Sequence, residues 1–267
     1  MHLGLAFWYG LAFKMVMTAA VVVAASVAVE RSGPFIGALI AALPTAAGAA
    51  YVILAWEHPA SFIAASAIGS VAVGAAVSIF AAAYTMLAQR HGLLFCLVVS
   101  LLIWFAAVAA LRTVTWTALG AVALNVVVFG ITVPLSWRYR TSGPPPKFMR
   151  TGYDIPLRAL TAAVVVAIVT TASYSIGSFA SGMFALFPIV LCSFIVILHP
   201  RIGGRAVASV LAHAQLPLIG LSLGFLVVHY LAEPAGVWWA LAAGLAACVA
   251  WSGTLLLLRM RNAKQKM

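Results

Sequence analysis

The polar side chains that could bind a ligand stand inside long apolar runs. His213 and Gln215 come shortly before Pro217 in one such run. A histidine in hydrocarbon is a functional candidate, because its burial is costly and its charge changes near neutral pH. The alternative is a neutral His213 that bonds a backbone carbonyl exposed by Pro217. Asn125 lies near the middle of another run, where its amide either binds substrate or, as the simpler alternative, bonds a neighbouring helix.

Another polar group ends an apolar run beside Gly177. These residues either line a cavity or satisfy the backbone groups of a helix end. At the matching place in the first half of the chain, Arg31 precedes Gly33. Arg31 either attracts an anion toward the positive end of a helix that begins at Phe35, or forms a solvated pair with Glu30. The polar group beside Gly177 consists of Thr170, Thr171, Ser173, Tyr174 and Ser175.

Catalytic constellations are missing from the sequence. No two carboxylates stand at helical spacing, which disfavours divalent-metal transport and magnesium-dependent lipid transfer. We find no Gly-x-Ser-x-Gly elbow, no paired Cys and His, and no phosphate-binding Gly-rich loop of the ATPase type. We therefore expect no metal, no cofactor and no enzymatic activity. The acidic residues are Glu30, Glu57, Asp154 and Glu233.

One stretch that could position these side chains occurs twice. In each copy a glycine breaks an apolar run, a phenylalanine restarts it, and a proline follows inside the next run. A proline inside a helix removes a backbone hydrogen bond, and in hydrocarbon the freed carbonyl must be satisfied by protein or by water in a cavity. Paired interruptions of this kind point to a transporter's binding site. The two copies, offset by 144 positions, are Gly33, Phe35, Pro44 and Gly177, Phe179, Pro188.

Further matches between the two halves indicate a duplication. The segment Thr-Ala-Ala-Val-Val-Val-Ala begins at position 18 and again at position 161. His58-Pro59 matches His199-Pro200, and both pairs are typical of helix starts. Trp104 and Arg112 match Trp251 and Arg259 with the same spacing, which is harder to attribute to chance than matches of Val and Ala.

The apolar runs predict an all-α membrane protein with about nine transmembrane helices, because each approaches the ~20 residues that cross a bilayer. Two repeats of four spans separated by one span would be inverted, since the odd span turns the second repeat over. We expect helices 2 and 7 to be kinked or broken. The predicted units are a first repeat at 1–112, a connecting helix at 113–137, a basic Pro-rich loop at 138–158, a second repeat at 159–258 and a basic tail at 259–267. The predicted spans are 15–32, 35–55, 60–88, 92–111, 115–137, 159–176, 179–198, 206–231 and 237–258.

Composition excludes a soluble domain. Only 7% of the residues are charged, against about 25% in soluble proteins. The net charge of +11 comes from basic residues at the ends of apolar runs, so we expect anionic lipid headgroups rather than nucleic acid as partners of the basic loop and tail. Because positive loops face the cytoplasm, we place 138–158 and the C-terminus inside, and the N-terminus outside, a prokaryotic inner membrane. Residues 3–13 either begin the first helix or lie at the interface, and 14–29 resembles a signal peptide but recurs at 158–173, so we count it as structure.

We therefore expect a gradient-driven transporter of a small organic anion or neutral metabolite, with the two repeats rocking about a central site. Three alternatives remain: a membrane-embedded enzyme acting on lipid, a non-catalytic assembly subunit, and a channel. The small-residue pairs Ser70/Gly74 and Gly220/Gly224 favour tight internal packing, with a homodimer seam as the weaker alternative. The expected substrate-binding residues are Arg31, Gly33, Phe35, Pro44, Asn125, Tyr174, Gly177, Phe179, Pro188, His213 and Gln215.

Overall fold

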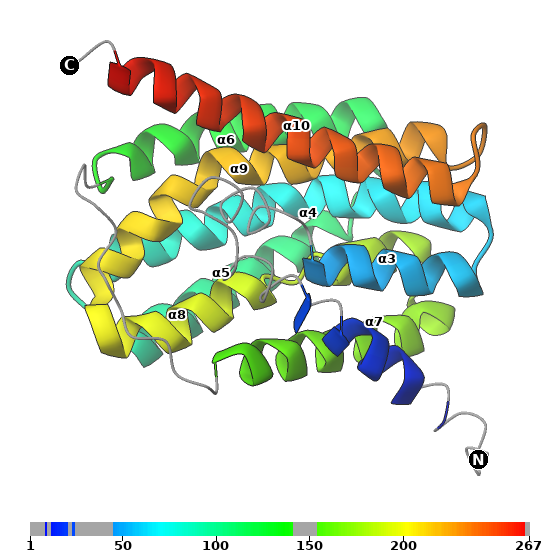
Figure 1. The fold of residues 1–267 in the computed structure, drawn as a ribbon, viewed down its shortest axis with the longest axis horizontal. Helices are drawn as coiled ribbons and strands as arrows, with labels where there is room; N and C mark the ends of the chain where they lie inside the picture. Colours follow the sequence, from blue (N-terminus) through cyan, green and yellow to red (C-terminus); the bar gives the residue numbers. More distant parts are fainter. Residues whose placement is uncertain (1–8, 10–11, 21–22, 25–44, 141–153, 265–267) are drawn as a thin grey trace.

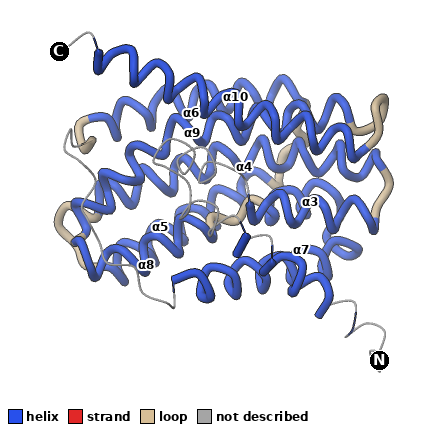
Figure 2. Tube along the Cα trace, viewed as in Figure 1, coloured by secondary structure: helices blue, strands red, loops and turns tan. Residues whose placement is uncertain are grey.

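All regular secondary structure in the described part of the chain is helical. The computed structural model describes residues 9, 12–20, 23–24, 45–140 and 154–264, and Figure 2 draws them as helices joined by loops. Residues 12–20 are helical. The labelled helices that follow are α3 (Thr45–Glu57), α4 (Ala60–Leu87), α5 (Leu93–Leu111), α6 (Ala118–Trp137), α7 (Asp154–Ala185), α8 (Ile189–Ile202), α9 (Gly204–Leu231) and α10 (Val237–Lys264).

Six described helices are long and apolar enough to cross a membrane, which is compatible with a multi-pass membrane protein. They are Ala60–Leu87, Leu93–Leu111, Ala118–Trp137, Ala162–Ala185, Gly204–Leu231 and Val237–Leu258. Two further apolar helices, Ala46–Glu57 and Ile189–Ile202, are shorter than a full span. The structure therefore supports the predicted class but does not give nine full-length spans among the described residues.

Helix α4 is the centre of the bundle. It contacts α5, α6, α7 and α9, and most of its length is buried, whereas α5, α6 and α10 leave most of their surface exposed. The close approach of α4 to its neighbours follows from its small residues, because Ala, Gly and Ser let helix backbones come near one another. In Figure 1 it runs through the middle of the stack, between α9 and α3.

Helix α7 is two helical segments separated at Gly177. This residue has φ 80° and ψ 171°, a conformation that favours glycine, so the helix is interrupted where the sequence predicted a break. The chain reverses there. Figure 1 shows α7 crossing the molecule before turning back. After the turn the segment runs parallel to α4, because Ser66 and Ser70 of α4 donate in the same order to the carbonyls of Ser178 and Gly182.

The run predicted at 179–198 is interrupted again before Pro188. The helical segment after Gly177 ends at Ala185, and α8 begins at Ile189 with Pro188 as its N-cap. Between them, the amides of Leu186, Phe187 and Ile189 make only short-range bonds to Met183, Phe184 and Phe187. Pro188 has no amide proton to continue the ladder, which explains the interruption.

The two His-Pro pairs are not equivalent. Pro59 is the N-cap of α4, as expected for a helix start. Pro200, however, lies inside the last turn of α8, and the next helix starts after Gly203, so the expectation of a helix start at His199-Pro200 is wrong. Gly203 has φ 81°, which lets the chain turn without a proline.

Candidate functional site

A buried polar layer joins α4, α6 and α9. The Ser78 hydroxyl donates to the Gln215 side-chain oxygen over 2.7 Å and lies 2.6 Å from the Thr132 hydroxyl. The Gln215 amide donates to the Ser78 carbonyl over 3.1 Å and reaches the Ser136 hydroxyl at 3.5 Å. All four side chains are buried. The layer is therefore a satisfied network that ties three helices together.

A second layer lies in the same three-helix interface. The Asn125 amide donates to the carbonyls of Val71 and Ala121 over 2.7 and 2.8 Å, and its oxygen accepts from Ser222 over 3.0 Å. A Cβ at Gly74 would meet Ser222 and Asn125 at close range, so glycine is needed there for the helices to touch. We name the two layers together, with Ser78, Thr132, Ser136, Gln215, Asn125 and Ser222 as members, the α4–α6–α9 seam.

The helical segment after Gly177 packs against another face of α4. Ser66 donates to the Ser178 carbonyl over 2.9 Å, and Ser70 donates to the Gly182 carbonyl over 2.7 Å. The Gly182 carbonyl would ordinarily accept from the amide four residues later, at position 186, but that amide bonds position 183 instead. Ser70, itself 2.7 Å from the Tyr51 hydroxyl, therefore satisfies a carbonyl freed by the broken helix.

A charged cluster stands where α3 meets α4. Lys14 and Glu57 form an ion pair at 2.6 Å, and the second carboxylate oxygen of Glu57 is buried without a partner among the described residues. His58 lies 2.8 Å from the Ser173 hydroxyl, and its ring contacts Tyr174. Burial lowers the pKa of His58 below its usual 6.5, Glu57 opposes this shift, and Lys14 adds to it.

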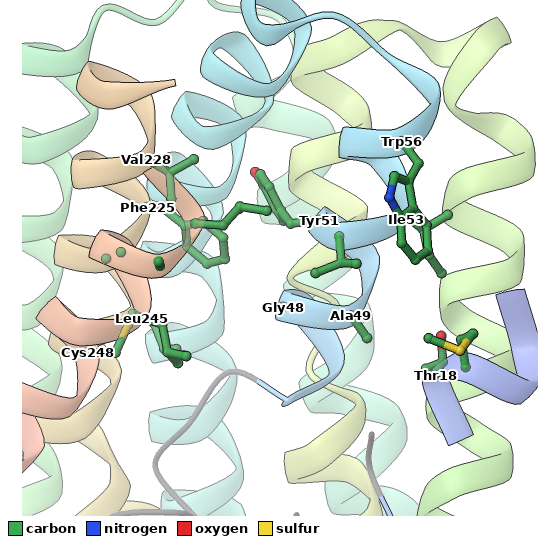
Figure 3. A pocket seen from close by; sticks show the side chains of 17 residues that line it. Thr18, Gly48, Ala49, Tyr51, Ile53, Trp56, Phe225, Val228, Leu245 and Cys248 are labelled. Atoms are coloured by element: carbon green, nitrogen blue, oxygen red, sulfur yellow. The ribbon is translucent and has the colours of Figure 1, made fainter. Parts of the chain in front are cut away.

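An apolar cavity of about 360 Å³ lies between residues 17–18, α3, α9 and α10. Figure 3 shows Tyr51 and Ile53 of α3 facing it from one side and Phe225 and Cys248 from the other. Its lining among the described residues carries no charged side chain. A groove of about 440 Å³ follows α6 and α9 and has Asn125 and Ser222 in its wall. Both hollows suit an uncharged, largely apolar molecule better than an ion.

The structure brings only some of the predicted binding residues together. Asn125 and Gln215 both belong to the α4–α6–α9 seam. Tyr174 is 66% exposed beside His58, away from that seam. Phe179 and Pro188 lie with Gly177 on the interrupted segment that packs against α4 and α8. Four predicted residues lie outside the described part of the chain: Arg31, Gly33, Phe35 and Pro44.

His213 does not bond the carbonyl that Pro217 exposes, which was the alternative predicted from the sequence. Its Nδ1 atom lies 2.8 Å from the carbonyl of Ser209, one turn earlier in α9. Pro217 instead frees the carbonyl of His213 itself, because that is the acceptor four residues before it. The bonded carbonyl is thus not the one that the proline exposes, and His213, only half-buried, is not a member of the seam.

Several residues of these sites escaped sequence reasoning. Ser66, Ser70, Gly74 and Ser78 recur every fourth position in α4, of which only Ser70 and Gly74 were recognised as small contact residues. Such a stripe drifts slowly around a helix, so its first half meets α7 and its second half meets α6 and α9. The recurrence of a small residue at every fourth position was the sequence pattern that could have predicted these contacts.

The described residues contain no group of three His, Cys, Asp or Glu side chains that could hold a metal ion. No family model, curated protein or solved structure matches the chain. The sites above are therefore assigned from geometry alone.

Proposed function

We propose that the chain is a gradient-driven transporter of a small neutral metabolite or organic anion, built from two inverted repeats that rock against each other. One observation carries the proposal: helices of the two halves match at a constant offset, and contacts between them exchange under that offset. Inverted repeats with interrupted helices are the architecture of many secondary transporters.

The helix boundaries supply the offset. Helix α4 runs from Ala60 to Leu87 and α9 from Gly204 to Leu231, so both ends differ by 144 positions. The starts of α5 and α10, Leu93 and Val237, differ by the same amount. This equals the offset between the repeated Gly, Phe and Pro residues of the sequence. In this register Trp104 corresponds to Cys248 rather than to Trp251, so the tryptophan match is displaced by about one turn.

The contacts between α4 and α9 follow the same exchange. Thr85 reaches the Ala208 carbonyl at 3.4 Å, and His229 lies 2.9 Å from the Ala64 carbonyl. Moving each partner by 144 positions converts the first pair into the second. The pairs also join the end of each helix to the start of the other, so the two helices are antiparallel. These relations favour a two-fold axis in the membrane plane.

The seam layers are related in the same way. Under the offset, the directly bonded pair Ser78 and Gln215 converts into Val71 and Ser222, and Asn125 of α6 bridges these two residues by bonding each of them. Helix α6 thus flanks the proposed axis as a connecting helix would. The broken helix at 186–188 would offer the binding site.

A reversible clamp across the proposed axis tests the mechanism. A Cβ built at Gly74 lies 3.8 Å from the Cβ of Ser222, which is the usual separation in a disulfide. The variant Gly74→Cys/Ser222→Cys, in a background without the native cysteines, is reconstituted in vesicles loaded with a mixture of neutral and monoanionic metabolites. Release is followed by mass spectrometry before oxidation, after it, and after dithiothreitol.

We expect selective release that stops on oxidation and returns on reduction, while Gly74→Cys and Ser222→Cys alone do not respond. Unchanged release through a fully formed disulfide would exclude rocking across this seam. No selective release of any compound from the parent protein, which keeps Gly74 and Ser222, would contradict transport and favour an assembly subunit.

A further inference from the structure

Two fully buried donors on α5 have no hydrogen-bond partner among the described residues. The Ser100 hydroxyl and the Trp104 indole nitrogen are both unpaired, and both side chains are 0% exposed. They are one helical turn apart, so they point from the same face of α5. A buried donor without an acceptor is costly, and two on one face call for a specific explanation.

The Trp104 ring lies beside the interrupted helix. The Trp104 ring packs edge-on against Phe187, with ring centres 5.1 Å apart, and against Phe184 at 6.4 Å. Phe187 belongs to the three residues between the end of α7 and the start of α8.

The other buried or half-buried indoles among the described residues do have a hydrogen-bond acceptor. Trp251 donates to the Leu216 carbonyl over 2.8 Å, and Trp116 donates to the Leu111 carbonyl over 2.8 Å. Trp104 is more deeply buried than either, yet it lacks a carbonyl. Packing alone therefore does not explain why a tryptophan rather than a phenylalanine stands at position 104.

We propose that Ser100 and Trp104 are the donor side of a ligand-binding site at the 186–188 interruption, which receives the acceptor oxygen of a small uncharged group such as an amide or a ketone. This deepens the proposed function by naming two substrate contacts. The aromatic rings packed on Trp104 carry no charge, and a carboxylate held there without a cation would be strongly penalised.

The first test compares two tryptophan variants. Trp104→Phe removes a donor that has no partner in the free protein, so it should lose only ring packing and lower the melting temperature less than Trp251→Phe does. Trp251→Phe leaves the Leu216 carbonyl unpaired and should melt lower. If Trp104→Phe melts as low as Trp251→Phe, the indole already has a partner, such as the face of Phe187, and the proposal fails.

The second test observes the donor directly. The full chain, with ¹⁵N-labelled indoles and in detergent micelles, is titrated with N-methylacetamide or with sodium acetate, and the Trp104 signal is assigned by its loss in Trp104→Phe. N-methylacetamide should move the Trp104 indole proton downfield at least about threefold more than that of Trp251, and acetate should have less effect. Ser100→Ala should weaken the affinity for N-methylacetamide, measured from the Trp104 signal, about fivefold, the usual effect of losing one hydrogen bond.

If N-methylacetamide moves the Trp104 indole signal no more than that of Trp251, the proposed site is wrong. If acetate moves the Trp104 signal more than N-methylacetamide does, the assignment to an uncharged group is wrong. Neither titration requires transport. If the Trp104 signal shifts but the protein transports nothing, only the proposed transport function is wrong. If the protein transports a compound but the Trp104 signal does not shift, only the proposed site is wrong.

Discussion

Single residues in the α4–α6–α9 seam hold the bundle by hydrogen bonds that hydrocarbon cannot replace. We expect Gln215→Leu to lower the free energy of unfolding by about 1–3 kcal/mol, because the hydroxyl and carbonyl of Ser78 and the hydroxyl of Ser136 each lose a buried hydrogen bond. Unfolding in detergent micelles by increasing fractions of sodium dodecyl sulfate measures the change. Gln89→Leu is the matched control, since that half-buried amide makes one bond to the Thr85 carbonyl at the end of α4 and should cost less than about 0.5 kcal/mol. Equal losses in the two variants would contradict the role of the seam.

His58 makes stability depend on pH. Its pKa is lowered by burial, so between that value and the ordinary 6.5 the folded protein binds fewer protons than the unfolded chain. Its contribution is therefore fully present above about pH 6.5 and is lost as the pH falls through the lowered pKa. The melting temperature should drop between pH 7.5 and pH 5, and His58→Asn should reduce that drop while keeping a polar partner for Ser173. An identical pH profile in the variant would show that another group is responsible.

Among the elements, the segment 178–185 depends on glycine for its contact with α4. A Cβ at Gly182 would collide with the backbone carbonyl of Ser66, which cannot move without shifting the helix. Gly182→Ala should therefore destabilise the protein by about 1–3 kcal/mol or more. At Gly130, on the exposed face of α6, an added Cβ meets nothing within 4 Å, and Gly130→Ala should be neutral or stabilising by up to about 1 kcal/mol. Thermal unfolding in micelles compares the two, and destabilisation by Gly130→Ala of the same size would contradict the packing.

Sequence patterns predicted where the helices lie better than they predicted which helices contact each other. Charge-free runs identified both ends of α4, α5, α6 and α9 and the start of α10 within a few residues, because hydropathy and length are local properties. Helix α10 continues to Lys264, six residues beyond the predicted end at 258. The break at Gly177 was also predicted, since glycine and proline directly interrupt helices. What the sequence did not reveal was that Ser66 and Ser70 would cover that break, or that Trp104 would lie beside it. Those are contacts between distant segments, and no local pattern specifies which face of a buried helix meets which neighbour.

For the whole molecule, the decisive question is whether equivalent loops lie on opposite sides of the membrane. His91 and Ala235 are 144 positions apart and both exposed, His91 shortly before α5 and Ala235 shortly before α10. In the proposed orientation His91→Cys reacts with a membrane-impermeant maleimide only from the cytoplasmic side and Ala235→Cys only from outside. Because α4, α5 and α6 alternate in direction, Arg138→Cys at the end of α6 must report the same side as His91→Cys and serves as the control. The three native cysteines are buried and are replaced by alanine to give a silent background. If cysteines at 91 and 235 react from the same side, the two halves run in parallel, the two-fold axis disappears, and the rocking mechanism loses its structural basis.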